Sequence, residues 1–360
     1  MPLIILFLVV ILLIAFQEYA YRRLWNKGLR YSIRFSAKEA FEGDTLQLLE
    51  ELENNKALPL PWIYVQMQIS KNLVFDEDAA AGSLYSVMMH KATRRKKKFL
   101  CQKRGVYQIS NVSLSVSNLL HTRHYKKFVP NKNELLVFPK LLDSFGEINL
   151  LYRHLDSTVL TNRIINPDPF EFKGIRDYQP GDALKAVNFR ASAISQKLMV
   201  NIHAPTCAQK LTLVVNVDPH TGQSAELYEH AISLCATLAQ HYIGMEISVG
   251  FFTNGKDGGT AECIDLATGS SGGHLYHIFE CLARMSLNFK YRPMAEFMET
   301  FNDKEQMYVI ISPNHDETFM TAFHDLERRG VSAFLIVPTF KGMDVDVRKS
   351  EKIALWDSGL

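Results

Sequence analysis

The chain has 360 residues, of which 47% are hydrophobic and 22% charged, so it is long enough to form two or three folded domains. Its 19 glycines and 13 prolines are too few for a collagen-like or low-complexity chain. A balance of 40 basic against 38 acidic residues argues against a dedicated nucleic-acid-binding protein, which is usually strongly basic. The five cysteines include no CxxC pair, which argues against a disulfide framework or a structural zinc site and indicates a reducing compartment.

The first 25 residues have the pattern of a membrane anchor. The apolar run 3–16 is short for a span, but residues 1–21 reach spanning length if Gln17 and Glu18 lie at the membrane interface. Aromatic residues follow where an interfacial belt is expected, at Tyr19, Tyr21 and Trp25. The nearby basic residues all come after the run, at Arg22, Arg23, Lys27 and Arg30. By the positive-inside rule we predict a single-pass protein of the cell membrane, with residues 1–25 as its anchor and the bulk of the chain in the cytoplasm.

A cleaved signal peptide is the alternative reading of this segment. Signal peptides carry basic residues before their apolar run and small residues before the cleavage site. Here no Lys or Arg precedes Arg22, and Glu18 interrupts the candidate cleavage site. The sequence therefore favours an uncleaved anchor.

Residues 26–142 are predicted to form an all-β, sandwich-like domain of immunoglobulin size. Short segments alternate apolar and polar residues and are separated by turn residues, as in half-buried strands. These segments are 31–35, 45–48, 60–69, 105–109, 112–116 and 135–138.

One dense run of charge lies in this domain, at Arg94, Arg95, Lys96, Lys97 and Lys98. If it is functional, it is a lipid-facing surface that contacts anionic head groups near the anchor. If it is structural, it is a solvated hairpin or an edge strand that its charges protect from pairing. The structural reading is favoured. Nucleic acid is not expected as a partner, because the run lacks interleaved aromatic residues.

Residues 143–200 are predicted to connect this domain to the next, and they contain the most specific stretch of the chain. Arg176, Asp177 and Asp182 lie close to aromatic residues and to a turn at Pro180-Gly181. These charges either form an ion-pair bracket that holds a loop, or belong to a binding surface.

Residues 201–360 alternate strands with helices, which predicts an α/β domain with a doubly wound, mostly parallel sheet. The expected strands are 211–217, 245–252, 308–312 and 331–337, and the expected helices are 225–242, 274–284, 294–301 and 317–329. In such sheets the ligand crevice lies beyond the carboxyl ends of the strands.

Polar residues at alternate positions follow the first of these strands, at Asn216, Asp218 and His220. This pattern resembles the metal-ion-dependent adhesion site of von Willebrand factor A domains, in which Asp-x-Ser-x-Ser binds a divalent cation. Here only Asp218 supplies a carboxylate, so the site is degenerate and we predict no metal and no other cofactor, with a divalent cation as the less favoured alternative. His220 beside Asp218 is also a candidate general base.

The stretch around Arg176 resembles a bacterial family, the domain-of-unknown-function family fifty-eight (DUF58), whose hallmark is close to Arg-Glu-Tyr-x-x-Gly-Asp followed by Ile-x-Trp-Lys-x-Ser-Ala. The matching residues are Arg176, Asp177, Tyr178, Gly181, Asp182, Lys185, Asn188, Phe189 and Arg190. Asp177 replaces the usual Glu, and Phe189 replaces the usual Trp. The Asp-Pro-Phe-Gly motif usual after the basic β region appears only as residues 117–120, and one N-terminal span is visible where many members have two.

The resemblance implies a membrane anchor, a β domain and a von Willebrand factor A-like domain. It also implies a non-catalytic adaptor that works with a MoxR-type AAA+ ATPase in the assembly or maturation of a complex. From the residues, we expect partner binding at the crevice of Asn216, Asp218 and His220. Two alternatives stay open, a metal- or His-dependent hydrolase at this crevice and a lipid-binding protein.

Other candidate motifs are weaker. The glycine-rich segment 269–273 precedes a helix and could hold a phosphate, although a flexible loop is favoured. His274 and His277 could share a helix face without a third ligand, and Ser195 or Cys207 could serve as nucleophiles, but no spacing assembles a triad. The sequence indicates no small-molecule substrate.

Overall fold

The structure is a computed structural model that divides the chain into two compact units. The first comprises residues 1–140 and 282–284, and the second comprises residues 141–281 and 285–360. The described residues are 2–75, 82–142, 148–149, 151–153, 155–156, 167–180, 182, 184–205, 210–219, 224–258, 262–287, 292–304, 306–340 and 352–357.

The first unit begins with α1 (Pro2–Leu24), a helix long and apolar enough to cross a membrane. An 18-residue window of its 22-residue candidate span has a mean hydropathy of 2.6, and no residue of that window is buried within the protein. An N-terminal signal sequence would meet the same criteria of length and composition. At about 1.5 Å per residue, such a helix matches the ~30 Å hydrocarbon thickness of a bilayer.

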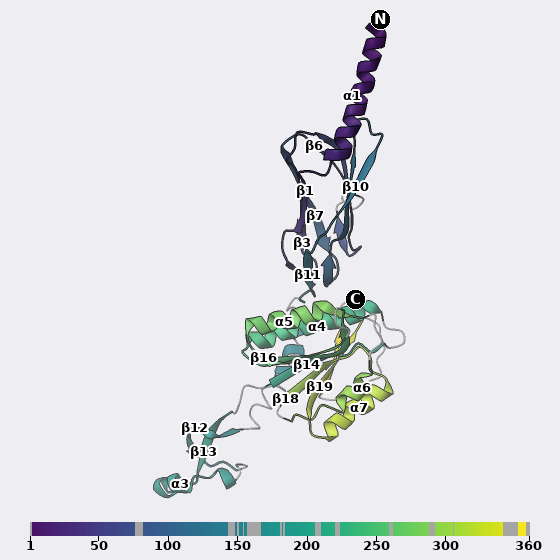
Figure 1. The fold of residues 1–360 in the computed structure, drawn as a ribbon. Helices are drawn as coiled ribbons and strands as arrows, with labels where there is room; N and C mark the ends of the chain where they lie inside the picture. Colours follow the sequence, from purple (N-terminus) through teal and green to yellow (C-terminus); the bar gives the residue numbers. More distant parts are fainter. Residues whose placement is uncertain are drawn as a thin grey trace. The chain divides into compact units, whose positions relative to one another are not determined.

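The rest of this unit is built of strands, as the alternating pattern predicts (Figure 1). Two four-stranded antiparallel sheets have the orders β1-β3-β7-β5 and β10-β9-β4-β6. A third sheet, β2-β11-β8, contains the parallel pair β2–β11. The strands are β1 (Leu29–Phe35), β2 (Glu39–Phe41), β3 (Thr45–Asn54), β4 (Leu60–Gln68), β5 (Leu73–Phe75), β6 (Ser83–Val87), β7 (Lys91–Cys101), β8 (Gly105–Gln108), β9 (Ser110–Ser117), β10 (His124–Val129) and β11 (Glu134–Phe138).

Alternate residues of these strands fill one hydrophobic core. In β4, for example, Leu60, Ile63 and Val65 are fully buried, while Trp62 and Tyr64 between them face outward. This alternation follows from the two-residue period of a strand.

The chain enters and leaves this β region at opposite ends. Lys91, at the start of β7, pairs with Asn54 near the end of α1. Cys101, at the other end of β7, accepts a hydrogen bond from Gly43, and the neighbouring Glu42 donates to Phe138 at the end of β11. The exit is therefore at the Cys101 end.

The second unit contains a two-stranded antiparallel arm, formed by β12 (Pro167–Asp177) and β13 (Met199–Pro205). Its tip carries a short 3₁₀ helix, η1 (Leu184–Ala186), and the helix α3 (Phe189–Ser195). We call residues 176–199 the motif arm, because they hold the family-like stretch. Before the arm, the described residues between 148 and 156 are helical, and Tyr152 stacks on His241 at 3.9 Å between ring centroids.

The remainder of the second unit is a seven-stranded, mostly parallel sheet, with α4 and α5 on one face and α6 and α7 on the other (Figure 1). Six of its strands have the order β16-β15-β14-β18-β19-β20, with β16 antiparallel to β15, and the seventh, β17, also pairs with β15 in antiparallel fashion. The strands are β14 (Lys210–Val215), β15 (Ser248–Asp257), β16 (Cys263–Gly269), β17 (Met285–Ser286), β18 (Gln306–Ile311), β19 (Ser332–Thr339) and β20 (Ile353–Asp357). The helices are α4 (Ala225–Gly244), α5 (Gly272–Arg284), α6 (Met294–Met298) and α7 (Glu317–Arg328).

The continuous apolar sequences of the central strands explain their burial on both faces. Leu211, Leu213 and Val214 in β14 are fully buried, as are Val309 and Ile310 in β18. Helix α4 begins at its N-cap Ser224, whose side chain accepts a hydrogen bond from the Leu227 amide. The edge strands β16 and β20 were not expected from the sequence, because their residues lack a long apolar run.

Candidate functional site

The carboxyl ends of β14 and β18 form the place where a ligand is expected in this sheet. These two strands are neighbours, but the chain continues from β14 to β15 on one side and from β18 to β19 on the other. This reversal of strand order is the topological switch point at which open α/β sheets bind ligands. The sequence-predicted residues Asn216 and Asp218 follow β14, and Ser312 follows β18.

A network of buried amide and hydroxyl groups occupies this switch point. Asn216 is fully buried, and its Nδ2 donates to Ser312 Oγ at 2.9 Å. Asn254, at the end of β15, is also fully buried, and its Oδ1 accepts from the Val217 amide at 3.0 Å. Ser312 Oγ in turn donates to the carbonyl of Asn314. We call Asn216, Asp218, Asn254, Ser312 and Asn314 the switch-point cluster.

Asp218 is the carboxylate of this cluster, and both of its oxygens accept hydrogen bonds. Asn254 Nδ2 donates to Oδ1 at 2.7 Å, and the Met294 amide donates to Oδ2 at 2.8 Å. Asp218 thereby accepts a hydrogen bond from the first amide of α6, whose N-cap residue Pro293 makes no side-chain capping bond. Burial raises the pKa of Asp218, an effect that Asp316 reinforces and that the donated hydrogen bonds oppose.

This donor set does not fit a divalent cation. Hard cations such as Mg²⁺ and Ca²⁺ prefer several carboxylate oxygens, whereas in the switch-point cluster Asp218 stands among neutral amides and a hydroxyl. The nearby Asp316 carboxylate accepts hydrogen bonds from Asn314 Nδ2 and the Phe319 amide. Both Asp218 oxygens are already used to hold Asn254 and α6. Among the described residues, no group of three or more His, Cys, Asp or Glu side chains is arranged to hold a metal.

The motif arm brings the predicted charges together as a bracket. Arg176 forms a bidentate ion pair with Asp182, with Nη1–Oδ2 and Nη2–Oδ1 distances of 2.6 and 2.7 Å. Asp182 Oδ2 also accepts from the Gln179 amide at 2.8 Å. These bonds lower the pKa of Asp182 to about 2, the Arg176 bonds being the main cause. The bracket closes the turn between β12 and η1.

A second set of polar contacts fixes α3 against β13. Asn188 is the N-cap of α3, and its Oδ1 accepts from the Ala191 amide at 2.9 Å. Its Nδ2 donates to Asn201 Oδ1 at 2.7 Å. Ser192 Oγ accepts from the Met199 amide at 2.8 Å. The family-like residues Arg176, Asp182 and Asn188 therefore act as internal braces of the arm.

The same braces hold large apolar side chains in water. Leu184, Phe189 and Ile194 are 75%, 77% and 80% exposed, and Leu198 is also exposed. Val187 and Val200, which bridge the arm beneath them, are buried. We call Leu184, Phe189, Ile194 and Leu198 the arm patch. Of these four only Phe189 was named in the sequence analysis, although the apolar residues of 184–198 are visible as a set flanked by Lys185, Arg190 and Lys197.

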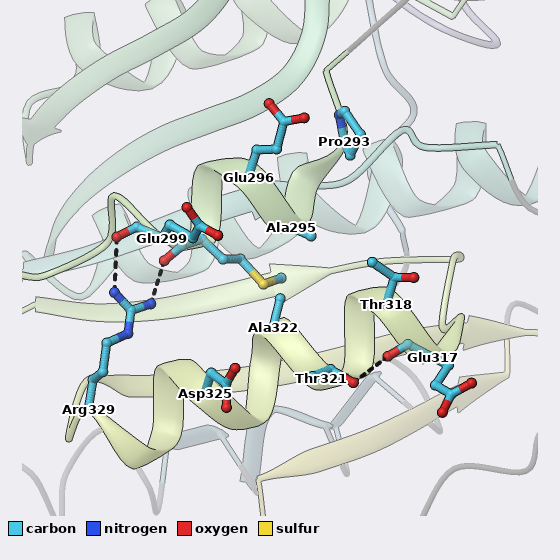
Figure 2. Close-up of a pocket in the computed structure, with 11 residues that line it drawn as sticks. Pro293, Ala295, Glu296, Glu299, Glu317, Thr318, Thr321, Ala322, Asp325 and Arg329 are labelled. Carbon is cyan, nitrogen blue, oxygen red and sulfur yellow. Dashed lines mark hydrogen bonds between the residues drawn. The ribbon is translucent and has the colours of Figure 1, made fainter.

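An open groove of about 800 Å³ lies between α6 and α7 (Figure 2). Met298 and Ala322 contribute apolar surface, and acidic side chains outnumber basic ones around it. Arg329 is the basic residue of the lining, and its guanidinium donates to the carbonyls of Met298 and Glu299 at 2.6 and 3.0 Å. The acidic lining residues are Glu296, Glu299, Glu317 and Asp325. Two of them pair with arginines, Glu296 with Arg292 and Asp325 with Arg328.

The charged run of the first unit lies on β7 and is largely paired within the sheet. Arg94 forms an ion pair with Glu51 of β3 at 2.7 Å, and Lys97 pairs with the buried Glu50 at 3.0 Å. Arg95 lies over the ring of Tyr85, 4.4 Å from its centroid. Lys96 and Lys98 are exposed. Strand β5 pairs with β7 only at residues 99–101, so among the described residues the charged part of β7 pairs with β3 alone. This geometry supports the edge-strand reading.

Among the residues that the structure describes, the remaining candidates do not form a catalytic group. His274 Nε2 is 2.6 Å from the Val249 carbonyl, while His277 pairs with Glu280 at 3.7 Å. Ser195 Oγ donates to the carbonyls of Ala191 and Lys197 at the end of α3. In the glycine-rich segment, Ser271 caps α5. Gly181, Cys207 and His220 lie outside the described residues.

Comparisons with known proteins leave the family open. No protein-family model matches the chain, and no curated protein does. Several solved structures resemble parts of it. The cupredoxin domain of amoB from Nitrosocaldus yellowstonii shows 10% identity and a TM-score of 0.21, over 32% of this chain and 94% of that one. A non-cellulosomal cohesin from Archaeoglobus fulgidus shows 9% identity and a TM-score of 0.20, over 35% and 98% of the two chains. E. coli alpha-2-macroglobulin shows 13% identity and a TM-score of 0.22, over 31% of this chain and 7% of that one. At these scores the likenesses carry no argument about fold or function.

Proposed function

We propose that the chain is a membrane-anchored, non-catalytic interaction protein of the family fifty-eight type. In this proposal α1 anchors the chain in the cell membrane and both units lie in the cytoplasm, which the positive-inside rule supports through the basic residues after the span. The second unit is von Willebrand factor A-like. In support of this, its strand order follows the doubly wound pattern, with an antiparallel strand at one edge.

The observation that carries the proposal is the arm patch. Four large apolar side chains stand in water on a segment that is held in shape by a bidentate ion pair, a helix cap and a serine bridge. We take this concentration of exposed large apolar side chains on one short segment as the mark of a surface that another protein covers. Because the polar braces fix its shape in advance, little further ordering is needed on binding. The expected partner is a MoxR-type AAA+ ATPase, with which the protein would assemble or mature a complex.

The switch-point cluster contributes to this function as a support. Since both Asp218 oxygens are used internally, a substitution there would disturb α6 and the sheet edge together. A test of partner capture is therefore cleaner at the arm than at Asp218. The poor fit of the described donor set speaks against the metal-dependent form of the hydrolase alternative.

The test is affinity capture from native membranes with the full chain in nanodiscs, with and without ATP and magnesium. Phe189→Ser is compared with Phe128→Ser, since both phenylalanines are highly exposed and Phe128 lies on β10 in the first unit. We expect nucleotide-dependent capture of the ATPase, reduced at least tenfold by Phe189→Ser and unchanged by Phe128→Ser. Equal capture by both variants would refute the role of the arm patch. If the ATPase is captured neither with nor without ATP and magnesium, the proposal that it is the partner is refuted.

A further inference from the structure

Helix α1 is packed into the β region rather than joined to it by a free linker. Tyr21 is fully buried, and its hydroxyl donates to the Pro59 carbonyl at 2.5 Å. Trp25 stacks on Tyr125 with 5.5 Å between ring centroids. Lys56 Nζ donates to the carbonyls of Trp25 and Lys27 at 2.7 and 2.9 Å. The direction of α1 therefore fixes which end of the β region faces the membrane.

Two turns at that end carry exposed apolar residues. The turn between β9 and β10 presents Leu119 and Leu120, and the turn between β6 and β7 presents Met88 and Met89. These four side chains are 50%, 53%, 52% and 51% exposed. We call them the apolar turns.

Polar contacts hold both turns in place. Asn118 is buried, and its Oδ1 accepts from the amides of Thr122 and Arg123 at 2.8 and 3.2 Å. Asn54 is buried as well, and its Nδ2 donates to the Met88 carbonyl at 3.1 Å. The apolar side chains are thus presented to water by ordered turns, as those of a prepared binding surface are.

An ion pair shows where along α1 the turn between β9 and β10 lies. Arg123 Nε lies 3.3 Å from Glu18 Oε1, and Glu18 comes two residues after the end of the apolar run at Phe16. At about 1.5 Å per residue, Glu18 lies about 3 Å along α1 beyond the last residue of the apolar run, and its ion pair with Arg123 holds the turn next to this end of the run. The second turn lies next to the segment 54–58, which contacts the residues just after α1.

The charges of this end suit an anionic lipid surface. Arg22, Arg23 and Lys27 are exposed around the end of α1, and Arg123 is more than half exposed beside Glu18. The cationic run on β7 is less well placed. Arg94 is three residues and Lys98 seven residues beyond Lys91, or about 10 and 23 Å at ~3.3 Å per residue along the strand.

We propose that the apolar turns are a bilayer-contacting face, which inserts Leu119, Leu120, Met88 and Met89 among the lipid head groups and seats the β region on the membrane. The occupant is the lipid surface itself. The surrounding cations add attraction to anionic lipids. The inference rests on the proposed anchoring by α1, with which the face is continuous.

The test uses the full chain in nanodiscs of phosphatidylcholine and phosphatidylglycerol, with a single nitroxide label at position 9, 74, 89 or 120 and the native cysteines replaced. Collision with a water-soluble nickel chelate reports exposure to the aqueous phase. Position 74 is the matched control, because Val74 is also apolar and exposed but pairs with Leu100 at the far end of β7. We expect labels at 89 and 120 to be at least threefold less accessible than the label at 74, and position 9 to be fully shielded.

The outcomes separate this inference from the anchor. If position 9 is shielded but 89 and 120 are as accessible as 74, the bilayer-contacting face is refuted and the anchor stands. If position 9 is accessible too, the anchor has failed and the inference fails with it. Should the cysteine replacements impair folding, a photoactivatable phospholipid is used on the unmodified chain. Lipid adducts at 88–90 and 118–121 are then expected, and their absence beside adducts on α1 refutes the face.

Discussion

The switch-point cluster and the motif arm are both built from residues that look chemically active in the sequence, yet they use them differently. At the switch point the polar groups are buried and satisfy one another around a single carboxylate. In the arm the polar groups are partly exposed and hold apolar side chains in water. The difference teaches that burial, more than residue type, decides whether a polar motif is a site or a support.

The largest expected effect is at the switch point, with Asn216→Asp. The change replaces the Nδ2 donor to Ser312 by an acceptor and puts a second buried carboxylate next to Asp218. We expect a loss of about 3 kcal/mol in local stability, measured as faster hydrogen exchange of the β14 and β18 amides. The control is Asn302→Asp, where the residue is exposed and its acceptor oxygen is kept. Unchanged protection of β14 would mean that the cluster tolerates two carboxylates, and would restore the case for a cation.

The same contrast can be tested within one strand of the first unit. Lys97→Ala removes the ion-pair partner of Glu50, which is 1% exposed and would be left as a buried, unpaired charge. We expect destabilisation of about 3 kcal/mol, seen in hydrogen exchange of β3 and β7. Lys96→Ala, at an exposed neighbouring position, should stay within about 0.5 kcal/mol of the wild type. Equal effects would show that the run acts through its total charge.

In the arm, Asn188→Ala should have a smaller and more local effect. It removes the N-cap of α3 and the bond to Asn201, which is expected to cost about 1 kcal/mol. Exchange of the α3 amides should accelerate while that of β14 stays unchanged. Ser195→Ala, at the other end of α3, serves as the control. A loss of protection that spreads to β14 would contradict the view of the arm as a separately braced element.

The smallest effects are opposite dependences on pH. The pKa of Asp182 is lowered from 3.8 to about 2, so its stabilising contribution is present above pH 3.8 and is lost as the pH falls through about 2. The pKa of Asp218 is raised above 3.8, so the folded state binds this proton more tightly than the unfolded state does. Its contribution to stability is therefore present below pH 3.8 and is lost as the pH rises through the raised pKa. Protection of the Gln179 amide should therefore fall on acidification, and that of β14 should rise. Asp182→Asn and Asp218→Asn should each abolish their own dependence, and parallel behaviour of both reporters would contradict the assignment.

Much of the framework could be predicted from periodicity alone. Continuous apolar runs predicted β14, β18 and β19, and alternating apolar residues predicted β1, β4 and β9. Both patterns are visible because a strand that packs against a core needs apolar residues at regular positions. For the charge run on β7 the sequence left a hairpin and an edge strand open, since its cations are offset by glutamates that lie 43 and 47 positions earlier in the chain. That pairing depends on register, which no local pattern reveals.

The site was predictable in position but not in character. The rule for open α/β sheets located the switch point, and Asn216, Asp218 and Ser312 do meet there. Asn254 was missed, because its role depends on where β15 ends relative to β14. The arm patch was missed for a different reason. Apolar residues in sequence are assigned to a core by default, and only the folded arm shows that Leu184, Phe189 and Ile194 have none.

The entry and exit of the chain at opposite ends of the β region have a mechanical consequence. A pull on residue 140 while α1 is held in a membrane would load the region along its strands, between the Cys101 end and the α1 end. The exit strand β11 pairs in parallel with β2, so such a load would shear the β2–β11 hydrogen bonds, which would have to break together. Under the proposed function, the first unit would pass a pull from the partner to α1 through this pairing.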